Sequence, residues 1–198
     1  MIIYGDSKSG NCYKLQLLCS NLAIPHRWIE IDILNGDTQT KQFVAKNPNG
    51  KIPIIELDSG EVLTESNAIL HFLASESALL PTIPLKHAQV LQWQFFEQYS
   101  HEPYIAVARF IEKYLGLPDD RLAEYRQKKQ GGYKALDIME QHLAKHHFFV
   151  DEKYSIADIS LYAYTHVAHE GGFDLTHYPN INAWLKRISQ QPGFQPMA

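Results

Sequence analysis

Residues 47–69 read NPNGKIPIIELDSGEVLTESNAI, and this stretch decides the fold. Residues 52–57 form a short apolar run that predicts a strand, and residues 58–60 are typical of a turn. Residues 61–63 predict a second strand that pairs back on the first. From Ile69 onward, apolar residues recur at helical spacing. We therefore expect a β-hairpin followed by a helix.

Upstream of this stretch, the chain predicts a strand, a helix and a second strand. Residues 2–4 are a short apolar run, and apolar side chains recur at helical spacing from Leu15 to Leu22. Residues 28–33, rich in isoleucine, predict the second strand. Two strands joined by a crossover helix pair in parallel, so the later hairpin adds an antiparallel edge. Residues 1–76 therefore predict an α/β domain with the order βαβ–ββα.

Beyond residue 76 the character of the sequence changes. Residues 77–85 contain two prolines and show no clear period, which is typical of a linker. From Lys86 onward the sequence carries almost no strand signal, so residues 86–198 predict an all-α helical bundle. The predicted helices cover about 86–115, 120–146, 156–169 and 180–190.

Composition excludes several classes of protein. Of the 198 residues, 45% are hydrophobic and 20% charged, which is typical of a globular protein. The net charge of −4 lacks the basic excess of a nucleic-acid binder. No apolar run is long enough to span a membrane, and the N-terminus does not resemble a secretory signal. Cys12 and Cys19 lie two helical turns apart, too far for a disulfide. We expect a cytoplasmic protein.

One helix start in the second domain has a clear signature. Ser155-Ile156-Ala157-Asp158 fits the capping-box pattern, with Asp158 in place of the usual glutamate. The Ser155 side chain would accept from the backbone of Asp158, and the carboxylate would reach back. We interpret this pair as structural, and we expect its loss to cost about 1 kcal/mol or more.

Three loops of the first domain carry side chains suited to binding a ligand. Residues 7–12 connect a strand to a helix, and free N–H groups at a helix start stabilise an anion. Small polar residues such as Ser9 are also common as simple helix caps, and this alternative stays open.

The other two loops lie in the stretch quoted above. If Pro53 follows a cis bond, the turn exposes the backbone of Ile52 to an extended, peptide-like ligand; alternatively, the proline simply ends a loop. Lys51 could equally be a solvated surface lysine.

Ser66 can cap the last helix of the domain, and the helix start then makes a carboxylate pocket. Glu65 beside it could hold an ammonium group. A ligand with an α-carboxylate and an α-amine satisfies both.

Four motifs occur in an order and spacing that match one known family. They are Ser9-Gly10-Asn11-Cys12, residues 47–53, residues 65–69 and the capping box at residues 155–158. Together they resemble the cytosolic glutathione S-transferase superfamily, and most closely a bacterial member of its serine-type group. The flanks at residues 97–103 and 169–173 also look like a bacterial subgroup. The resemblance covers nearly the whole chain and implies a thioredoxin-like first domain and a helical second domain.

The resemblance implies a transferase that uses glutathione as co-substrate, without a metal, for an activity typical of detoxification. Ser9 would hydrogen-bond the glutathione sulfur, with Asn11 assisting. The backbone of Ile52, held by a cis Pro53, would bind the cysteinyl part.

The same resemblance assigns the two ends of glutathione. Lys51 would pair with the glycyl carboxylate, while Glu65 and Ser66 would hold the γ-glutamyl end. The chain departs from related serine-type members near Thr38-Gln39, where they often place a histidine. Gln39 could reach the glycyl end instead.

Hydrogen bonding alone can ionise such a thiol. A free thiol has a pKa near 8.5, so only about 3% is thiolate at pH 7. Lowering the pKa by about two units needs roughly 2.7 kcal/mol. One hydroxyl bond to the anion supplies about 1.5–3 kcal/mol and a helix N-terminus about 0.3–1 kcal/mol. The gain from ionisation is about 25-fold at pH 7, and further acceleration has to come from placing the electrophile.

The second substrate, a small hydrophobic electrophile, is expected near the first long helix of the second domain. His101, Tyr104 and Ala108 are the candidate lining residues, although such spacing is also common in a core. The resemblance further implies a homodimer, packed near the last helix of the first domain and the first two helices of the second.

Other functions stay open. A glutathione-dependent disulfide or peroxide oxidoreductase could use glutathione's own thiol, because Ser9 replaces the first thiol of a Cys-x-x-Cys motif. A non-catalytic, glutathione-binding interaction protein could use the same scaffold. The histidine pairs 142/146 and 166/169 lack a convincing third metal ligand, so we expect no metal site.

Overall fold

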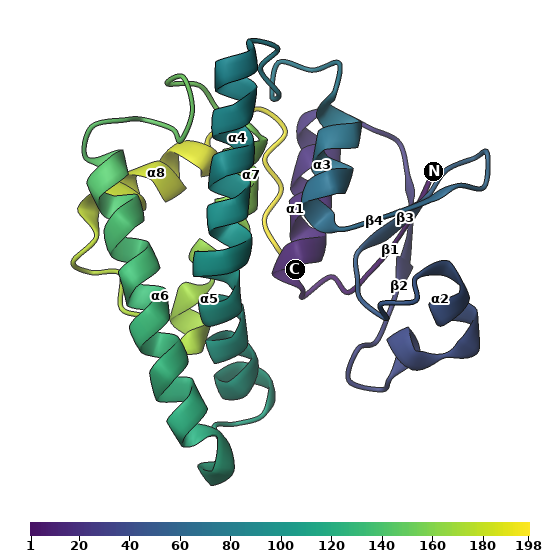
Figure 1. Cartoon of the computed structure of the whole chain (residues 1–198), viewed down its shortest axis with the longest axis horizontal. Helices are drawn as coiled ribbons and strands as arrows, with labels where there is room; N and C mark the ends of the chain where they lie inside the picture. Colours follow the sequence, from purple (N-terminus) through teal and green to yellow (C-terminus); the bar gives the residue numbers. More distant parts are fainter. The chain divides into compact units, whose positions relative to one another are not determined.

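The computed structural model describes all 198 residues and divides into two compact units. The first comprises Met1–Ser77 together with Gln191–Ala198, and the second comprises Ala78–Gln190 (Figure 1). The sequence predicts that residues 191–198 belong to the helical domain, whereas the structure joins them to the first unit.

Two hydrogen bonds explain where the C-terminal segment lies. The Tyr13 hydroxyl donates to the carbonyl oxygen of Gln195 at 2.6 Å, and the Asn21 amide donates to that of Pro192 at 2.8 Å. Gly193 has a positive φ of 70° and approaches Ser20 so closely that a Cβ there would lie 2.6 Å from its carbonyl oxygen. The segment therefore follows the helix that carries these residues, and glycine is required at this approach.

A four-stranded sheet forms the centre of the first unit, in the order β2-β1-β3-β4. The parallel pair β1–β2 and the antiparallel hairpin β3–β4 confirm the predicted topology, and β1 also pairs antiparallel with β3. The strands are β1 (Ile2–Gly5), β2 (Arg27–Glu30), β3 (Ile54–Glu56) and β4 (Val62–Thr64).

Strand β2 ends three residues earlier than predicted. The Asp32 carboxylate accepts from the backbone N–H groups of Leu34 and Asn35 at 2.9 and 3.0 Å. These side-chain-to-backbone bonds form a turn that competes with sheet pairing. Ile31 consequently lies in a loop, where it packs with Phe43 and Ile54.

Three helices accompany the sheet. Helices α1 and α3 pack against each other, and Figure 1 shows them side by side. Helix α1 is confirmed where the sequence predicts it, and Leu15, Leu17 and Leu18 are fully buried. Buried side chains lie on several sides of α1, so the helix is not the amphipathic one that the sequence predicts. The helices are α1 (Gly10–Asn21), α2 (Lys41–Lys46) and α3 (Ser66–Ala74).

The second unit is helical, as predicted, with one isolated bridge between Val150 and Lys153 as its only strand-like pairing. Helix α4 begins at Pro84, inside the segment predicted as a linker, because proline is well suited to the first turn of a helix. No helix of the chain combines the length and apolar character that crossing a bilayer requires. The helices are α4 (Pro84–Phe96), α5 (Glu102–Arg109), α6 (Leu122–Leu143), α7 (Ile156–Thr165) and α8 (Pro179–Ser189), with π-helical segments at Glu97–His101 and Phe110–Tyr114.

The predicted capping box is present at the start of α7. Asp158 is fully buried and accepts from the Ser155 backbone and hydroxyl, both at 3.0 Å. Its other oxygen accepts from the Phe149 backbone at 3.1 Å and the Trp184 indole at 3.0 Å. Asp158 therefore joins α7 to the preceding loop and to α8, whereas a simple capping residue bonds only to the start of its own helix.

We predict that Asp158→Ala lowers the free energy of unfolding by about 2–4 kcal/mol, because it leaves several buried donors without an acceptor. A cap alone would cost about 1 kcal/mol. Urea unfolding followed by circular dichroism measures the difference, with the exposed Asp120→Ala variant as a control. A loss no larger than that of the control would contradict the structural role.

Candidate functional site

Ser9 lies at the point where β1 turns into α1. Its backbone is extended, with φ −83° and ψ 127°, and it occupies the N-cap position of the helix. Its carbonyl oxygen accepts the first helical bond, from Tyr13, at 2.9 Å. Its hydroxyl accepts no bond from the N–H groups of the helix start. The simple capping interpretation therefore does not describe the Ser9 side chain.

Cys12, three residues further on, is a buried structural thiol. Burial raises the pKa of Cys12 to about 12, against the opposing effect of a side-chain hydrogen bond with Ser9. The position in the first helical turn allows a depressed pKa in principle, and here desolvation prevails. Burial likewise raises the pKa of Cys19 to about 12, and both cysteines are free.

Asn11 and Ser66 come together, although 55 residues separate them in the sequence. The Ser66 hydroxyl donates to the Asn11 side-chain oxygen at 3.3 Å, and Ser66 is 6% exposed. The Lys14 ammonium donates to the same hydroxyl at 3.3 Å. The start of α1 and the start of α3 are thereby joined through side chains.

Lys14 is a member of this cluster that the sequence interpretation missed. Its side chain is 0% exposed, although lysine is almost never fully buried in proteins. The available signal was a lysine within the mostly apolar run Cys12–Leu18, in which Gln16 is the other polar residue.

Helix α3 starts one position earlier than a Ser66 cap would place it. Glu65 is the N-cap, with φ 67° and ψ 111°, and its carbonyl oxygen accepts from Ile69 at 2.9 Å. Ser66 is therefore the first helical residue and not the cap, which corrects its predicted role. A positive φ is rare for a residue with a Cβ, and such strained positions are concentrated at functional sites. The Glu65 side chain is exposed.

The loop before β3 presents the third part of the site. The Ile52–Pro53 peptide bond is cis. The Asn47 side chain donates to the Lys51 carbonyl oxygen at 2.7 Å and leaves the Lys51 side chain exposed. A Cβ on Gly50 would lie 2.8 Å from the Gln39 side-chain nitrogen, so Gln39 packs on this loop beside Lys51.

Comparison with known protein families gives a match for each of two parts of the chain. Residues 9–76 match the glutathione S-transferase N-terminal domain, and residues 92–192 match the C-terminal domain. A glutathione S-transferase structure from Pseudomonas fluorescens Pf-5 is 60% identical, with a TM-score of 0.98 over 99% of this chain and 98% of that one. The chain belongs to the glutathione S-transferase family. The resemblance to the glutathione S-transferase superfamily and the fold expected from it are thus confirmed.

Curated relatives of this family member fall into two groups. Glutathione S-transferase 3 of Zea mays is 27% identical over 98% of this chain and 90% of that protein. Elongation factor 1-gamma of Carassius auratus is 34% identical over 77% of this chain. The chain spans only about a third, 35%, of the length of the latter protein.

The candidate electrophile residues of this glutathione S-transferase family member are mostly inaccessible. His101 is 0% exposed, and its ring contacts the Thr165 hydroxyl at 2.9 Å. Ala108 is also 0% exposed. Neither has a surface for a second substrate, which corrects the prediction for both. Tyr104 is half-buried, and its ring packs over Gly131 of α6.

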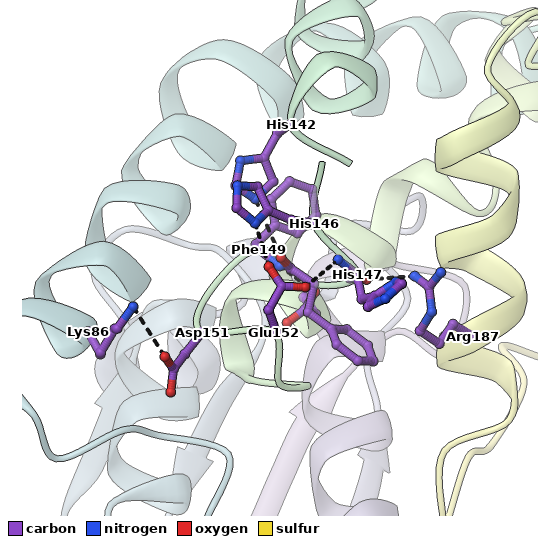
Figure 2. A network of polar contacts seen from close by, with 10 residues as sticks. Lys86, His142, His146, His147, Phe149, Asp151, Glu152 and Arg187 are labelled. Atoms are coloured by element: carbon purple, nitrogen blue, oxygen red, sulfur yellow. Dashed lines mark hydrogen bonds and ion pairs between the residues drawn. The ribbon is translucent and has the colours of Figure 1, made fainter. Parts of the chain in front are cut away.

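The histidine pairs take part in structural contacts. Figure 2 shows His142 and His146 stacked, with ring centres 4.4 Å apart, and His146 in contact with Glu152. His166 stacks on Tyr162 at 4.6 Å. No group of three or more His, Cys, Asp or Glu side chains is arranged to hold a metal ion.

We predict that thiol reagents modify neither cysteine in the native protein at pH 7.5, because both are buried and the pKa of each is about 12. Labelling with a chromogenic disulfide should be at least about 100-fold slower than in guanidinium, where both thiols react. Rapid native labelling that Cys12→Ala abolishes would instead indicate a reactive Cys12.

Proposed function

We propose that the chain is a serine-type glutathione transferase in which Ser9 stabilises the glutathione thiolate. The single observation that carries this proposal is the Ser9 hydroxyl, which lies at the N-terminus of α1 and makes no capping bond. A hydroxyl donor at a helix start suits an anionic sulfur. The first turn of α1 contains no acidic residue to oppose that charge.

Glutathione fits the rest of the cluster by its charges. Its γ-glutamyl end carries a carboxylate and an amine, which suit the N-terminus of α3 at Ser66 and the exposed carboxylate of Glu65. Its glycyl carboxylate suits the exposed ammonium of Lys51, with Gln39 beside it. The backbone of Ile52, next to the cis bond, lies between these groups in the sequence and is assigned to the cysteinyl part.

The reaction follows from this binding mode. The Ser9 hydroxyl donates to the thiolate, Asn11 assists, and the sulfur attacks a small hydrophobic electrophile. A carbon–sulfur bond forms, and the leaving group of the electrophile, such as chloride, departs with the electron pair of the broken bond. The thiol proton leaves to water, because no general base or metal is needed at the proposed pKa. The partly exposed Tyr104 is the remaining candidate for the electrophile side.

The proposed protein is a cytoplasmic homodimer. Large apolar side chains are exposed on the elements where the family resemblance implies subunit contact. Phe72 of α3 is 48% exposed, and Phe95 and Tyr99, at the end of α4 and just beyond, are 59% and 76% exposed. Such side chains favour an interface over solvent.

Two alternatives keep specific support. A disulfide reductase would need glutathione's own thiol, because the only cysteine of the loop, Cys12, is buried. A non-catalytic role is supported by the 34% identity to elongation factor 1-gamma. Binding to immobilised glutathione distinguishes these functions. A transferase or a reductase is retained, whereas a non-catalytic protein whose site no longer binds glutathione is not.

For the proposed transferase, we predict that Ser9→Ala raises the thiol pKa of bound glutathione by about 1–2 units and lowers kcat/KM about 10–100-fold. The reason is that the variant loses one charge-assisted hydrogen bond to the sulfur. Ultraviolet titration of the thiolate and a chlorodinitrobenzene assay measure both. Ser59→Ala, in the exposed β3–β4 turn, is the control. If the thiol pKa of bound glutathione is unchanged in Ser9→Ala, the proposed role of Ser9 is wrong.

Lys51→Ala is expected to act differently. The ammonium is solvent-exposed, so its pairing with the glycyl carboxylate is screened and worth about 0.2–1 kcal/mol. We predict a KM for glutathione raised about 1.5–5-fold, with kcat and the thiol pKa unchanged. Steady-state kinetics at varied glutathione test this, and a large fall in kcat would contradict a role confined to binding.

A further inference from the structure

The strongest unexplained feature of the first unit is a fully buried lysine beside the candidate site. Lys14 lies on α1, one turn after Asn11, and is 0% exposed. Its ammonium lies 3.3 Å from the Ser66 hydroxyl oxygen. Burying an ammonium costs free energy unless polar partners compensate, so retaining one here needs a reason beyond packing.

The chemistry of the three groups fixes the direction of their hydrogen bonds. An ammonium has three donors and no acceptor, so the Ser66 oxygen accepts from Lys14. The single hydroxyl hydrogen of Ser66 is then directed to Asn11, 3.3 Å away. Because Ser66 donates, the Asn11 atom that faces it is the carbonyl oxygen and not the amide nitrogen.

This chain of bonds determines which end of Asn11 faces elsewhere. An asparagine side chain has one acceptor end and one donor end, and the two diverge from the same planar amide carbon. With its oxygen turned to Ser66, Asn11 presents its NH₂ end on the other side, two residues from Ser9 on the same helix start. An NH₂ donor stabilises a thiolate, whereas a carbonyl oxygen in its place would repel it.

We propose that Lys14 is a positioning residue that orients the Asn11 amide through the Ser66 hydroxyl, and thereby links the γ-glutamyl end of the site to its thiol end. This inference rests on the proposed function and names no contact between Lys14 and the substrate. Both bonds are 3.3 Å long, slightly beyond the usual range, and we expect them to shorten when ligand fills the site.

The test titrates bound glutathione in Lys14→Met, which removes the donor at similar volume. We expect the thiol pKa to rise by about 0.5–1 unit, part of the effect of a whole charge-assisted bond. Lys14→Arg, which keeps the donors, should restore most of the lowered pKa. Lys41→Met, at the exposed start of α2, is the matched control.

A double-mutant cycle distinguishes orientation from a simple effect of charge. If Lys14 acts through Asn11, then Lys14→Met adds no further rise in the Asn11→Ala background. An equal rise in both backgrounds overturns the proposal, because Lys14 would then act through space. An unchanged pKa in folded Lys14→Met also overturns it.

Two further readouts keep the outcome decisive. Thermal unfolding identifies a Lys14→Met variant that does not fold. Lys14→Leu, which also lacks a donor, then replaces it with the same expected rise in the thiol pKa. Suppose that the wild type lowers the thiol pKa of bound glutathione and that Ser9→Ala raises it. If the Lys14 variant then leaves this pKa unchanged, the result overturns the inference about Lys14 and not the proposed function. A wild type that binds glutathione without lowering its pKa overturns both proposals.

Discussion

The packing of α1 against α3 holds the polar groups of the site in place. Buried apolar side chains of α1, among them Leu15, Leu17 and Leu18, position the helix within the first unit. Both helix N-termini carry polar side chains, and Ser66 of α3 reaches Asn11 of α1. A shift of either helix by one residue rotates these groups by about 100° and separates them. The hydrophobic contact therefore sets the geometry, and the hydrogen bonds refine it.

Local sequence patterns predicted the elements of the fold well, because each is encoded by neighbouring residues. The parallel pair, the hairpin and the capping box at Ser155 all follow from short-range signals. Short-range signals did not predict the early end of β2, because apolar residues continue past the turn that Asp32 makes. The start of α3 also differed by one residue, because a serine favours the cap on average while Glu65 occupies it here.

Features that depend on distant residues were beyond the sequence patterns. The burial of Lys14 depends on Ser66, 52 residues away, and no periodicity encodes that contact. The burial of His101 depends equally on the contact of its ring with Thr165. Candidate site residues in the loops before α1 and β3 came from their residue types and from the family resemblance, and their roles stay predictions. Side chains on long apolar helices gave no such signal, so core and pocket faces could not be separated.

The return of the C-terminal segment to the first unit has a consequence for synthesis. The last residues of that unit, 191–198, leave the ribosome after the whole helical unit. Tyr13 and Asn21 therefore lack their partners at Gln195 and Pro192 until these residues have been synthesised. Domains that are continuous in sequence can fold one after another as they emerge. Here the N-terminal unit begins folding first and is completed last.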